Sequence, residues 1–554
     1  MDRNTLVAFF LIALVLIFTP KYMEMVSPLP QGERPDTADY LQEESPTTES
    51  LKIASPLPEI KKTKEELEEM PPVSEEVFLV ENNLYKAIVS SRGGGTIKSF
   101  QIKKYLGEDS LFVDLVKESA APNLLVQGLD LDGQSLKTSN PWILKSSFLG
   151  GEISEPETIS FSLNVGPGAA ITKSLTFNPD TYSIGIQLDG VGLREVLFGD
   201  LSFGWYGGLP STEVNLIDDR SYFNSYIYQG GELEELKTKE GESDRKQFNG
   251  SVDWMAIRTK YFIAAMVPDE PSKVRSATLS SDFKKDEKYD MAFSLDPTLG
   301  HSFSLYLGPL EYEKIKSFGH QLDLVMDFGW AFIRPISKAV LFSLKKMHEY
   351  IPNYGFVLIL FSICVKLLVF PLTKKSYQST AAMQLIQPEV AAIKEKHSSN
   401  PQKVNQLTMQ LYKDKGVNPL GGCLPMMLQM PLLFALFIVF RTTIELRMEP
   451  FVWWIKDLSS PDIIFNLPFT IPIYGAHVAV LPMLMVVSMF IQQRMMSGGA
   501  AQQPQQKTMQ YFMTAFFFLM FNSFPSGLNL YYTLFNVLTI LQQKLIPTNP
   551  SAAK

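Results

Sequence analysis

The 554-residue sequence predicts a multidomain membrane protein, in which a large antiparallel β domain precedes an α-helical transmembrane bundle. Three observations predict this fold class. The chain is too long for one compact domain. Residues 1–327 carry 31 Lys+Arg against 50 Asp+Glu, whereas residues 328–554 carry 19 against 8. Short β-type runs also give way to long apolar segments near residue 327. Such uneven charge indicates two environments and argues against nucleic-acid recognition.

The N-terminus, residues 1–23, contains the apolar run TLVAFFLIALVLIF. This run makes about 21 Å of helix, short for a ~30 Å bilayer core unless its flanks contribute. A cleaved signal peptide looks similar, but no small-x-small site precedes Pro20, which favours an uncleaved transmembrane anchor. Residues 24–75 hold eight prolines and charged runs, the composition of a disordered linker.

Residues 76–326 are predicted to form a β sandwich. Runs such as AAITKSLTF, YSIGIQLDG and HSFSLYLGP are short, rich in β-branched and aromatic residues, and separated by Gly, Asn and Asp. The aromatic residues are more typical of a core than of a ligand-stacking platform. This region has no cysteine, and the five histidines of the chain are scattered, so no disulfide, metal site or cofactor is predicted.

Residues 327–352 are predicted to form an interfacial amphipathic helix. Apolar residues recur every three or four positions, among them Ile333, Val340 and Leu344, and cations fill the other face. The pattern is typical of a helix on a membrane surface. A helix packed under the β domain is the alternative.

Five apolar segments predict further membrane spans, at about 354–372, 420–440, 473–491, 510–524 and 528–545. The loop 373–419 carries seven lysines against three acids, and the loop 492–509 carries two cations and no acid. In 442–466, by contrast, four acids outnumber two cations. The positive-inside rule therefore places both termini in the cytoplasm and the β domain outside, with six spans in all. Within 373–419, two helix-like runs flank the turn at His397–Pro401 and predict a helical hairpin. Its charge is either a topology signal alone or part of a docking arm.

Lys366 lies within the apolar stretch ICVKLLVFPL. An ionised lysine near a bilayer centre costs about 2.5–3.5 kcal/mol, so such residues face a cavity, find a partner or snorkel. The predicted span 354–372 ends six residues later, about 9 Å away, within reach of a lysine stem. Position alone leaves snorkelling and a functional polar cavity equally open.

Three stretches of the helical half carry a family resemblance: NYG…FPLTKKS (353–376), NPLGGCLPMMLQMPLLFALF (418–437) and FPSGLNLYY (524–532) followed by LQQKLI. In this order they resemble the YidC/Oxa membrane protein insertases. Upstream, NNLYKAIVSSRGG, SLTFNPDTYSI, KYFIAAMVP and YLGPLEYEKI resemble the large periplasmic domain of the Gram-negative branch.

The resemblance implies a protein of the Gram-negative inner membrane that is not an enzyme. It implies insertion, folding and assembly of membrane proteins, alone or with the Sec translocon. The expected partners are nascent membrane proteins, the Sec translocon, the ribosome and the lipid bilayer. It further implies a conserved core of five spans over 353–546, with a hydrophilic groove open to cytoplasm and lipid, and a periplasmic β-supersandwich.

Site residues follow from the same resemblance. Lys366 occupies the position of a groove cation that is commonly arginine; it keeps the charge but lacks the bidentate fork. Ser362 and Gln429 are expected groove residues, with ordinary interhelical hydrogen bonding as the alternative. The expected path for the substrate's apolar segment comprises Met430, Pro431, Phe521, Tyr531 and Tyr532. The tail, 547–554, has Lys554 as its only basic side chain, so ribosome docking is expected at Lys394, Lys396 and Lys403 of the hairpin.

Two other classes of protein remain as alternatives to an insertase. A transporter or channel is expected to have repeats and broken helices, and no repeat relates the halves of this sequence. A membrane-tethered sugar enzyme needs a paired histidine and carboxylate, and the β region offers His301 and His320 alone. No glycine-rich nucleotide loop of the Walker type is found.

Overall fold

The computed structural model describes residues 74–107, 109–116, 122–284, 288–398, 400–417, 424–471, 474–496 and 504–545. The predicted N-terminal anchor, nearly all of the linker and the C-terminal tail lie outside these residues, as does Cys423. Within them, strands dominate up to Pro309 and helices dominate from Arg334 onward. The predicted order of a β domain followed by a helical region is therefore confirmed.

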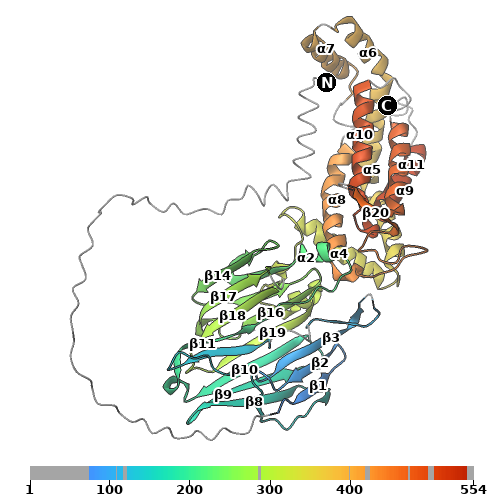
Figure 1. Ribbon diagram of the computed structural model, residues 1–554. Helices are drawn as coiled ribbons and strands as arrows, with labels where there is room; N and C mark the ends of the chain where they lie inside the picture. The colour runs from blue at the N-terminus through green and yellow to red at the C-terminus, as the bar shows by residue number, and fades with distance from the viewer. Residues whose placement is uncertain are drawn as a thin grey trace, which may run out of the picture. The chain divides into compact units, whose positions relative to one another are not determined.

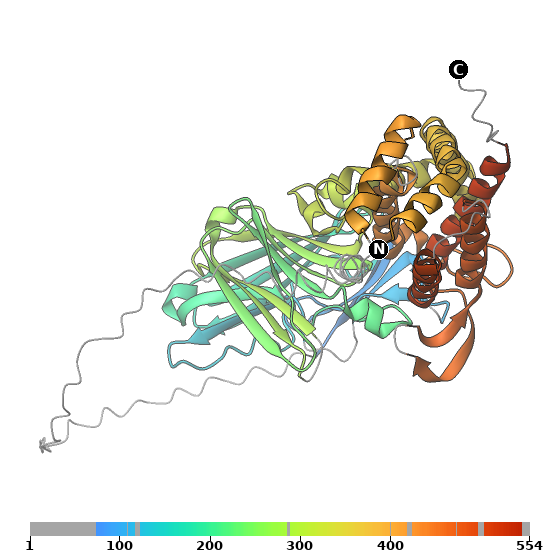
Figure 2. The ribbon, with the colours of Figure 1, turned by 90° about the horizontal axis from the view of Figure 1, so that it is seen from above.

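The β domain consists of three sheets, whose strands lie side by side in Figures 1 and 2. The first has the order β4 (Phe112–Asp114), β3 (Thr96–Leu106), β2 (Tyr85–Ser90), β1 (Val77–Glu81), β7 (Gly151–Glu152). The second has the order β13 (Glu232–Leu236), β12 (Asn224–Gln229), β15 (Trp254–Arg258), β16 (Phe262–Pro268), β19 (His301–Pro309), β10 (Ser183–Val191), β9 (Ala169–Phe177), β8 (Glu157–Gly166), β6 (Ile143–Leu144). The third has the order β14 (Ser243–Asn249), β17 (Val274–Asp282), β18 (Lys288–Leu295), β11 (Leu197–Trp205), β5 (Leu125–Asp130).

Pairing within the three sheets is antiparallel, as predicted, except where β1 runs parallel to β7. Three short helices interrupt the strands: η1 (Leu193–Glu195), α2 (Leu216–Arg220) and η2 (Pro271–Lys273). Two more follow the last strand of the domain: α3 (Tyr312–Phe318) and η3 (Leu322–Val325).

Aromatic side chains join the sheets into one core. The ring of Phe203 on β11 lies 5.1 Å from that of Phe303 on β19, and Phe78 on β1 lies 5.8 Å from Phe161 on β8. The predicted use of aromatic residues as core is therefore confirmed for these pairs. Close packing also explains Gly94, which has φ +66°: a Cβ there would lie 2.5 Å from the indole of Trp142.

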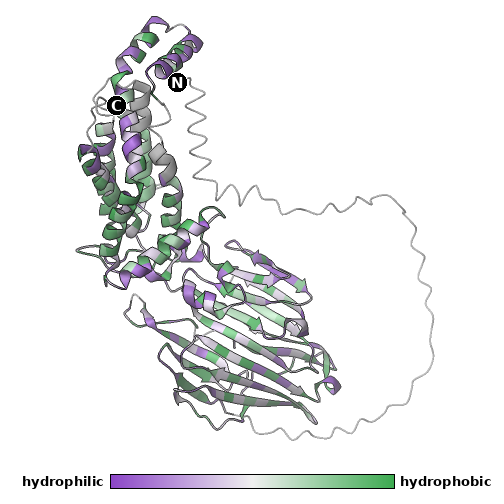
Figure 3. Cartoon of the chain, turned by 180° about the vertical axis from the view of Figure 1, so that it is seen from behind, coloured by the Kyte–Doolittle hydropathy of each residue, from purple (hydrophilic) through white to green (hydrophobic). Residues whose placement is uncertain are grey.

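The helical region comprises α4 (Arg334–His348), α5 (Tyr354–Leu385), α6 (Gln387–Lys396), α7 (Pro401–Asp414), α8 (Leu424–Thr442), η4 (Ile444–Leu446), α9 (Val480–Met496), α10 (Pro504–Phe521) and α11 (Ser526–Leu545). Hydrophobic residues predominate on the long helices and hydrophilic ones on α6 and α7 (Figure 3). Within the described residues, α5 is the one helix both long and apolar enough to cross a membrane by itself, and shorter apolar helices lie in α8, α9 and α10.

One helix runs past a predicted span, and another predicted span begins differently from the structure. The helix α5 continues beyond the predicted span, 354–372, to Leu385, because residues 373–385 contain neither glycine nor proline. The segment predicted as a span from 473 begins instead with a strand, β21 (Gly475–Ala479), paired with β20 (Ile463–Ile471). Gly475 has φ +96°, which a right-handed helix does not accommodate, and the helix α9 starts only at Val480.

The predicted amphipathic helix corresponds to α4, whose apolar face packs against α8 and α5. Val340, Leu341 and Leu344 are buried in that contact, whereas Phe342 on the other side is exposed. Lys338 forms an ion pair at 3.6 Å with Asp323 of η3, so the helix also touches the segment that leads out of the β domain.

A tight turn joins α10 and α11, as the sequence FPSG predicts. The Ser526 N–H donates to the Ser460 carbonyl at 2.8 Å, and the Gly527 N–H donates to the Leu458 carbonyl at 3.0 Å. The turn is therefore held against the loop that precedes β20.

Candidate functional site

Lys366 is buried on α5 and points toward α11. Its Nζ donates a hydrogen bond of 2.5 Å to Oγ1 of Thr539 and lies 3.8 Å from the centre of the Phe535 ring. At 1.5 Å per residue, Lys366 stands about 18 Å from the start of α5 and Thr539 about 20 Å from the start of α11. The ammonium therefore meets a partner at its own level, and in this structure it does not snorkel toward the end of the span.

Among the described residues, no side-chain hydrogen bond joins Lys366 to either of the other two predicted groove residues. Ser362, one turn earlier on α5, is fully buried and donates at 2.7 Å to the Leu358 carbonyl of its own helix. Its hydrogen bond is therefore intrahelical. Gln429 lies half-buried on α8, and among the described residues no hydrogen bond joins it to Lys366.

Further buried polar residues extend the site between α5, α9 and α11. Gln542 Nε2 donates to Thr373 Oγ1 at 2.9 Å, and Asn536 Nδ2 donates to Ser488 Oγ at 3.2 Å. We name the polar seam as the set of Lys366 and Thr373 on α5, Ser488 on α9, and Asn536, Thr539 and Gln542 on α11. Sequence reasoning missed all of these except Lys366.

The spacing of the α11 residues contained the missing signal. Asn529, Asn536, Thr539 and Gln542 recur at intervals of seven and three, which places them along one helix face. A polar stripe at this spacing within an apolar segment predicts a face turned toward other helices.

Three of the five residues expected along the substrate path form a buried aromatic cluster. The rings of Phe521 and Tyr532 lie 5.7 Å apart, and those of Tyr531 and Tyr532 lie 5.5 Å apart. The hydroxyl oxygens of both tyrosines have no hydrogen-bond partner among the described residues. Met430 and Pro431 on α8 are half-buried. The cluster thus combines apolar rings with unused hydrogen-bonding capacity.

The predicted helical hairpin consists of the end of α5, α6 and α7. Lys415 after α7 and Glu389 of α6 form an ion pair of 2.8 Å, which joins the two arms. Of the three lysines expected to dock, Lys396 and Lys403 are exposed and Lys394 is half-buried.

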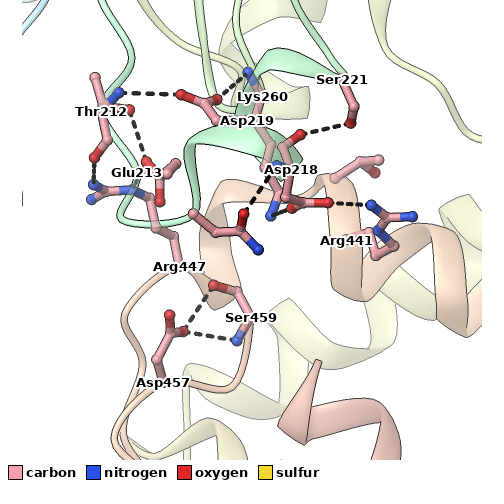
Figure 4. A network of polar contacts seen from close by, with 12 residues as sticks. Thr212, Glu213, Asp218, Asp219, Ser221, Lys260, Arg441, Arg447, Asp457 and Ser459 are labelled. Carbon is pink, nitrogen blue, oxygen red and sulfur yellow. Dashed lines mark hydrogen bonds and ion pairs between the residues drawn. The ribbon is translucent and has the colours of Figure 1, made fainter. Parts of the chain in front are cut away.

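A second polar network links the β domain to the far end of α8 (Figure 4). Asp218 of α2 forms ion pairs with Arg441 of α8 and, at 2.7 Å, with Lys260. Burial by itself would raise the pKa of Asp218, but the charges of Lys260 and Arg441 hold it below its ordinary value. This carboxylate therefore remains ionised at the junction.

Arg447, between η4 and β20, extends this network. Its Nε donates to Glu213 at 2.7 Å, and its Nη1 and Nη2 donate to the carbonyls of Leu106 at 2.8 Å and Thr212 at 3.2 Å. Its side chain is 1% exposed. A buried guanidinium with three partners fixes one geometry at this junction.

In the described part of the β domain, the histidines form no acid–base pair of the kind a sugar enzyme needs. His301 begins β19, and its Nε2 lies 2.9 Å from the carbonyl oxygen of Asp296. Over the described part of the chain, neither His301 nor His320 is hydrogen-bonded to a carboxylate, and no group of three or more His, Cys, Asp or Glu can hold a metal ion.

Two family models match the chain. One, described as YidC periplasmic domain, matches residues 78–340. The other, described as 60Kd inner membrane protein, matches residues 346–552. Together they cover the β domain and the helical region.

Full-length relatives match as well. The membrane protein insertase YidC of Chlorobium luteolum is 36% identical over 576 residues, covering 100% of this chain and 96% of that protein. The protein of the same name from Pelodictyon phaeoclathratiforme is 36% identical over 498 residues, covering 86% and 84%. Among solved structures, an active YidC insertase with its first transmembrane domain resolved shares 17% identity at a TM-score of 0.35, covering 85% of this chain and 92% of that one.

Proposed function

Because the chain belongs to the YidC family of membrane protein insertases, we propose that its helices form an insertase core around a positively charged hydrophilic groove. The protein is an inner membrane protein with a periplasmic β domain, and its family is not enzymatic. The proposal concerns how the chain spans the membrane, which residues receive the substrate, and which partners deliver it.

The proposed topology has six spans: the N-terminal anchor, α5, α8, α9, α10 and α11. Both termini lie in the cytoplasm. The 19 residues of α8 and the 20 of α11 give lengths of about 28 and 30 Å, close to the ~30 Å bilayer core. The extension of α5 past residue 372, with α6 and α7, then stands in the cytoplasm, in agreement with its exposed lysines.

The observation that best supports the proposed groove is the polar seam around Lys366. A charge at this depth costs about 2.5–3.5 kcal/mol, and burial between helices adds to that cost unless polar partners offset it. The Thr539 hydroxyl oxygen accepts one hydrogen bond from the ammonium group. The remaining ammonium protons can be donated to water or to a substrate carboxylate. An apolar side chain at this position would cost less free energy if packing were its only role. A function that uses the charge therefore explains why a lysine stands here.

A substrate uses the site in two ways. Its hydrophilic or acidic stretch enters the wet groove beside Lys366, which lowers the desolvation barrier to crossing. Its apolar segment passes along Met430 and Pro431 and then along Phe521, Tyr531 and Tyr532 into lipid. Because the last three are buried, this step requires α10 and α11 to separate from their neighbours when a substrate arrives.

The proposed partners are nascent membrane proteins, the ribosome and the Sec translocon. Lys394, Lys396 and Lys403 contact the ribosome, since the hairpin presents them at the cytoplasmic end of α5. Some clients enter from the ribosome directly and others pass from the Sec translocon, and neither route needs a cofactor.

Substitution of Lys366 tests the electrostatic role in a strain depleted of its own insertase. Attraction between the ammonium and one carboxylate is worth about 1–4 kcal/mol, so Lys366→Ala should reduce insertion of an acidic-tailed substrate at least ~5-fold. Lys366→Glu should reduce it further, and Lys366→Arg should retain it. A substrate with a neutral tail should respond much less.

Lys374→Ala is the matched control, because Lys374 lies on the same helix and is exposed. It should insert both substrates as the parent does. Normal insertion of the acidic-tailed substrate by both Lys366→Ala and Lys366→Glu, at parental protein levels, would refute the role of the charge.

A further inference from the structure

The hairpin of β20 and β21 has an unusual composition for an exposed sheet. Residues 463–479 contain no Asp, Glu, Lys or Arg. On β20, Ile464 is 55% exposed, Phe465 59% and Phe469 61%. Large apolar side chains thus face outward along a strand that belongs to a sheet of only two strands.

Water is a poor environment for such a hairpin. Two-stranded hairpins are marginally stable in water unless another element covers one face, and most of β20 is uncovered. A contiguous exposed apolar surface indicates a partner. That partner must be apolar, because the hairpin offers no charge to recognise a charged one.

The hairpin is nevertheless held firmly at one end of the bundle (β20, Figure 1). The Asn522 side chain at the end of α10 donates at 2.8 Å to the carbonyls of both Tyr474 and His477 and accepts from the Ala479 N–H. The Asp462 carboxylate accepts from the Val480 and Leu481 N–H groups, which start α9. Its exposed face is therefore a built surface with a fixed place in the fold.

Two observations identify the partner as lipid. The exposed apolar residues of the hairpin continue into those of α9, where Leu484 and Val487 are 45% and 56% exposed. The 17 described residues of α9 give about 25 Å of helix, about 5 Å less than the ~30 Å bilayer core, and the sequence Ser497-Gly498-Gly499 that follows disfavours a longer helix. If the cytoplasmic end of α9 stands at the membrane boundary, its first residue lies inside the outer leaflet, and so does the base of the hairpin.

We propose that the β20–β21 hairpin lies in the interfacial region of the outer leaflet and binds lipid, completing the span that α9 leaves short. Open strand edges need water for their backbone groups, which excludes the centre of the bilayer and fits the boundary between headgroups and acyl chains. Trp453, 88% exposed in the preceding loop, has the side chain typical of this depth. The proposal rests on the membrane topology given above, in which α9 is a span.

Fluorescence quenching in lipid bilayers tests the location. The full chain with Cys364→Ser and Cys423→Ser receives Phe465→Cys or, in a second variant, Thr470→Cys, and each is labelled with an NBD fluorophore and reconstituted in phosphatidylethanolamine–phosphatidylglycerol nanodiscs. Lipids with a doxyl group at carbon 5 should quench both labels at least twofold more than lipids with the group at carbon 12.

Two control positions calibrate the result. Phe198→Cys on β11, where the phenylalanine is 65% exposed, should not be quenched, and Val487→Cys within α9 should be quenched more by the carbon-12 lipid. Labels at 465 and 470 that resist quenching as the label at 198 does would overturn the lipid contact. Loss of quenching at 487 as well would overturn the topology instead. Both outcomes are separate from the insertion assay on Lys366.

Discussion

Lys173 supports a prediction about how the β domain responds to pH. This lysine is fully buried on β9 at the junction of the three sheets. Its Nζ donates to the carbonyls of Gly93, between β2 and β3, at 2.6 Å and of Leu124, before β5, at 2.5 Å. No carboxylate accompanies these two carbonyls in the contacts of the described residues. Burial lowers the pKa of Lys173 from 10.5 to about 7. A neutral amine has two N–H donors, and both are used here.

The sign and size of the effect follow from linkage. Between pH 7 and 10.5 the unfolded chain keeps a proton on Lys173 that the folded chain has lost, so the free energy of unfolding rises with pH. The slope approaches 1.4 kcal/mol per pH unit. Because the folded state is half-protonated at pH 7, the gain from pH 7 to pH 9 is about 2 kcal/mol. Below pH 7, Lys173 is increasingly charged in the folded state as well. The cost of burying that charge then lowers the free energy of unfolding of the domain by nearly its full value.

Lys173→Met removes this dependence. The full chain in detergent micelles is unfolded in urea at pH 7 and pH 9, and pulse proteolysis within the β domain gives the two free energies. The parent should gain about 2 kcal/mol more than Lys173→Met over this interval. At pH 9 the variant should also be about 1–3 kcal/mol less stable, because two buried carbonyls lose their donor.

A control separates this effect from other titrating groups. Lys145→Met replaces an exposed lysine of the same domain and should follow the parent at both values of pH. An equal pH response of Lys173→Met and the parent would refute the neutral buried lysine.

Three further substitutions test contacts outside the polar seam. Arg447→Met leaves the half-buried Glu213 without its cation and should destabilise the β domain–α8 junction by about 3–5 kcal/mol, seen as faster proteolysis near Thr212. Adding Glu213→Gln should restore part of the loss. Gly527→Val places a Cβ 2.5 Å from the Phe440 ring and 3.0 Å from the Leu458 carbonyl oxygen. It should lower the free energy of unfolding by about 1–3 kcal/mol and reduce the amount of protein in the membrane, whereas an unchanged amount argues against a tightly packed turn. Asn522→Leu removes three hydrogen bonds to the hairpin and should speed amide hydrogen exchange in β21 about 30–100-fold, and unchanged exchange would mean that other contacts hold it.

Local patterns in the sequence were sufficient for the order of the elements. Alternation of apolar and polar residues predicts β9, and hydrophobic runs predict α5 and α8. The same alternation places Lys173 on the inward face with Ile171 and Leu175, so its burial was readable from the strand pattern. Its loss of charge was not readable, because the lowered pKa depends on how completely the packed sheets exclude water from the amine.

The ends of the elements and the pairing of strands were harder to predict from the sequence. The sequence pattern predicts a loop and the start of a span where the structure has the hairpin of β20 and β21, because a short apolar run has the same composition in a strand and in a helix. The positive φ of Gly475 and the hydrogen bonds of Asn522 decide between the two, and neither is visible in the local pattern.

The sequence by itself determined that Lys366 lies within an apolar helix, at a depth set by its distance from the ends, because helix rise and hydropathy are local properties. Only the tertiary structure decided its partner, Thr539, which is 173 residues away, and assembled the polar seam from three helices. The physical reason is that a hydrogen bond between helices depends on which faces pack together, and packing is a property of the whole bundle.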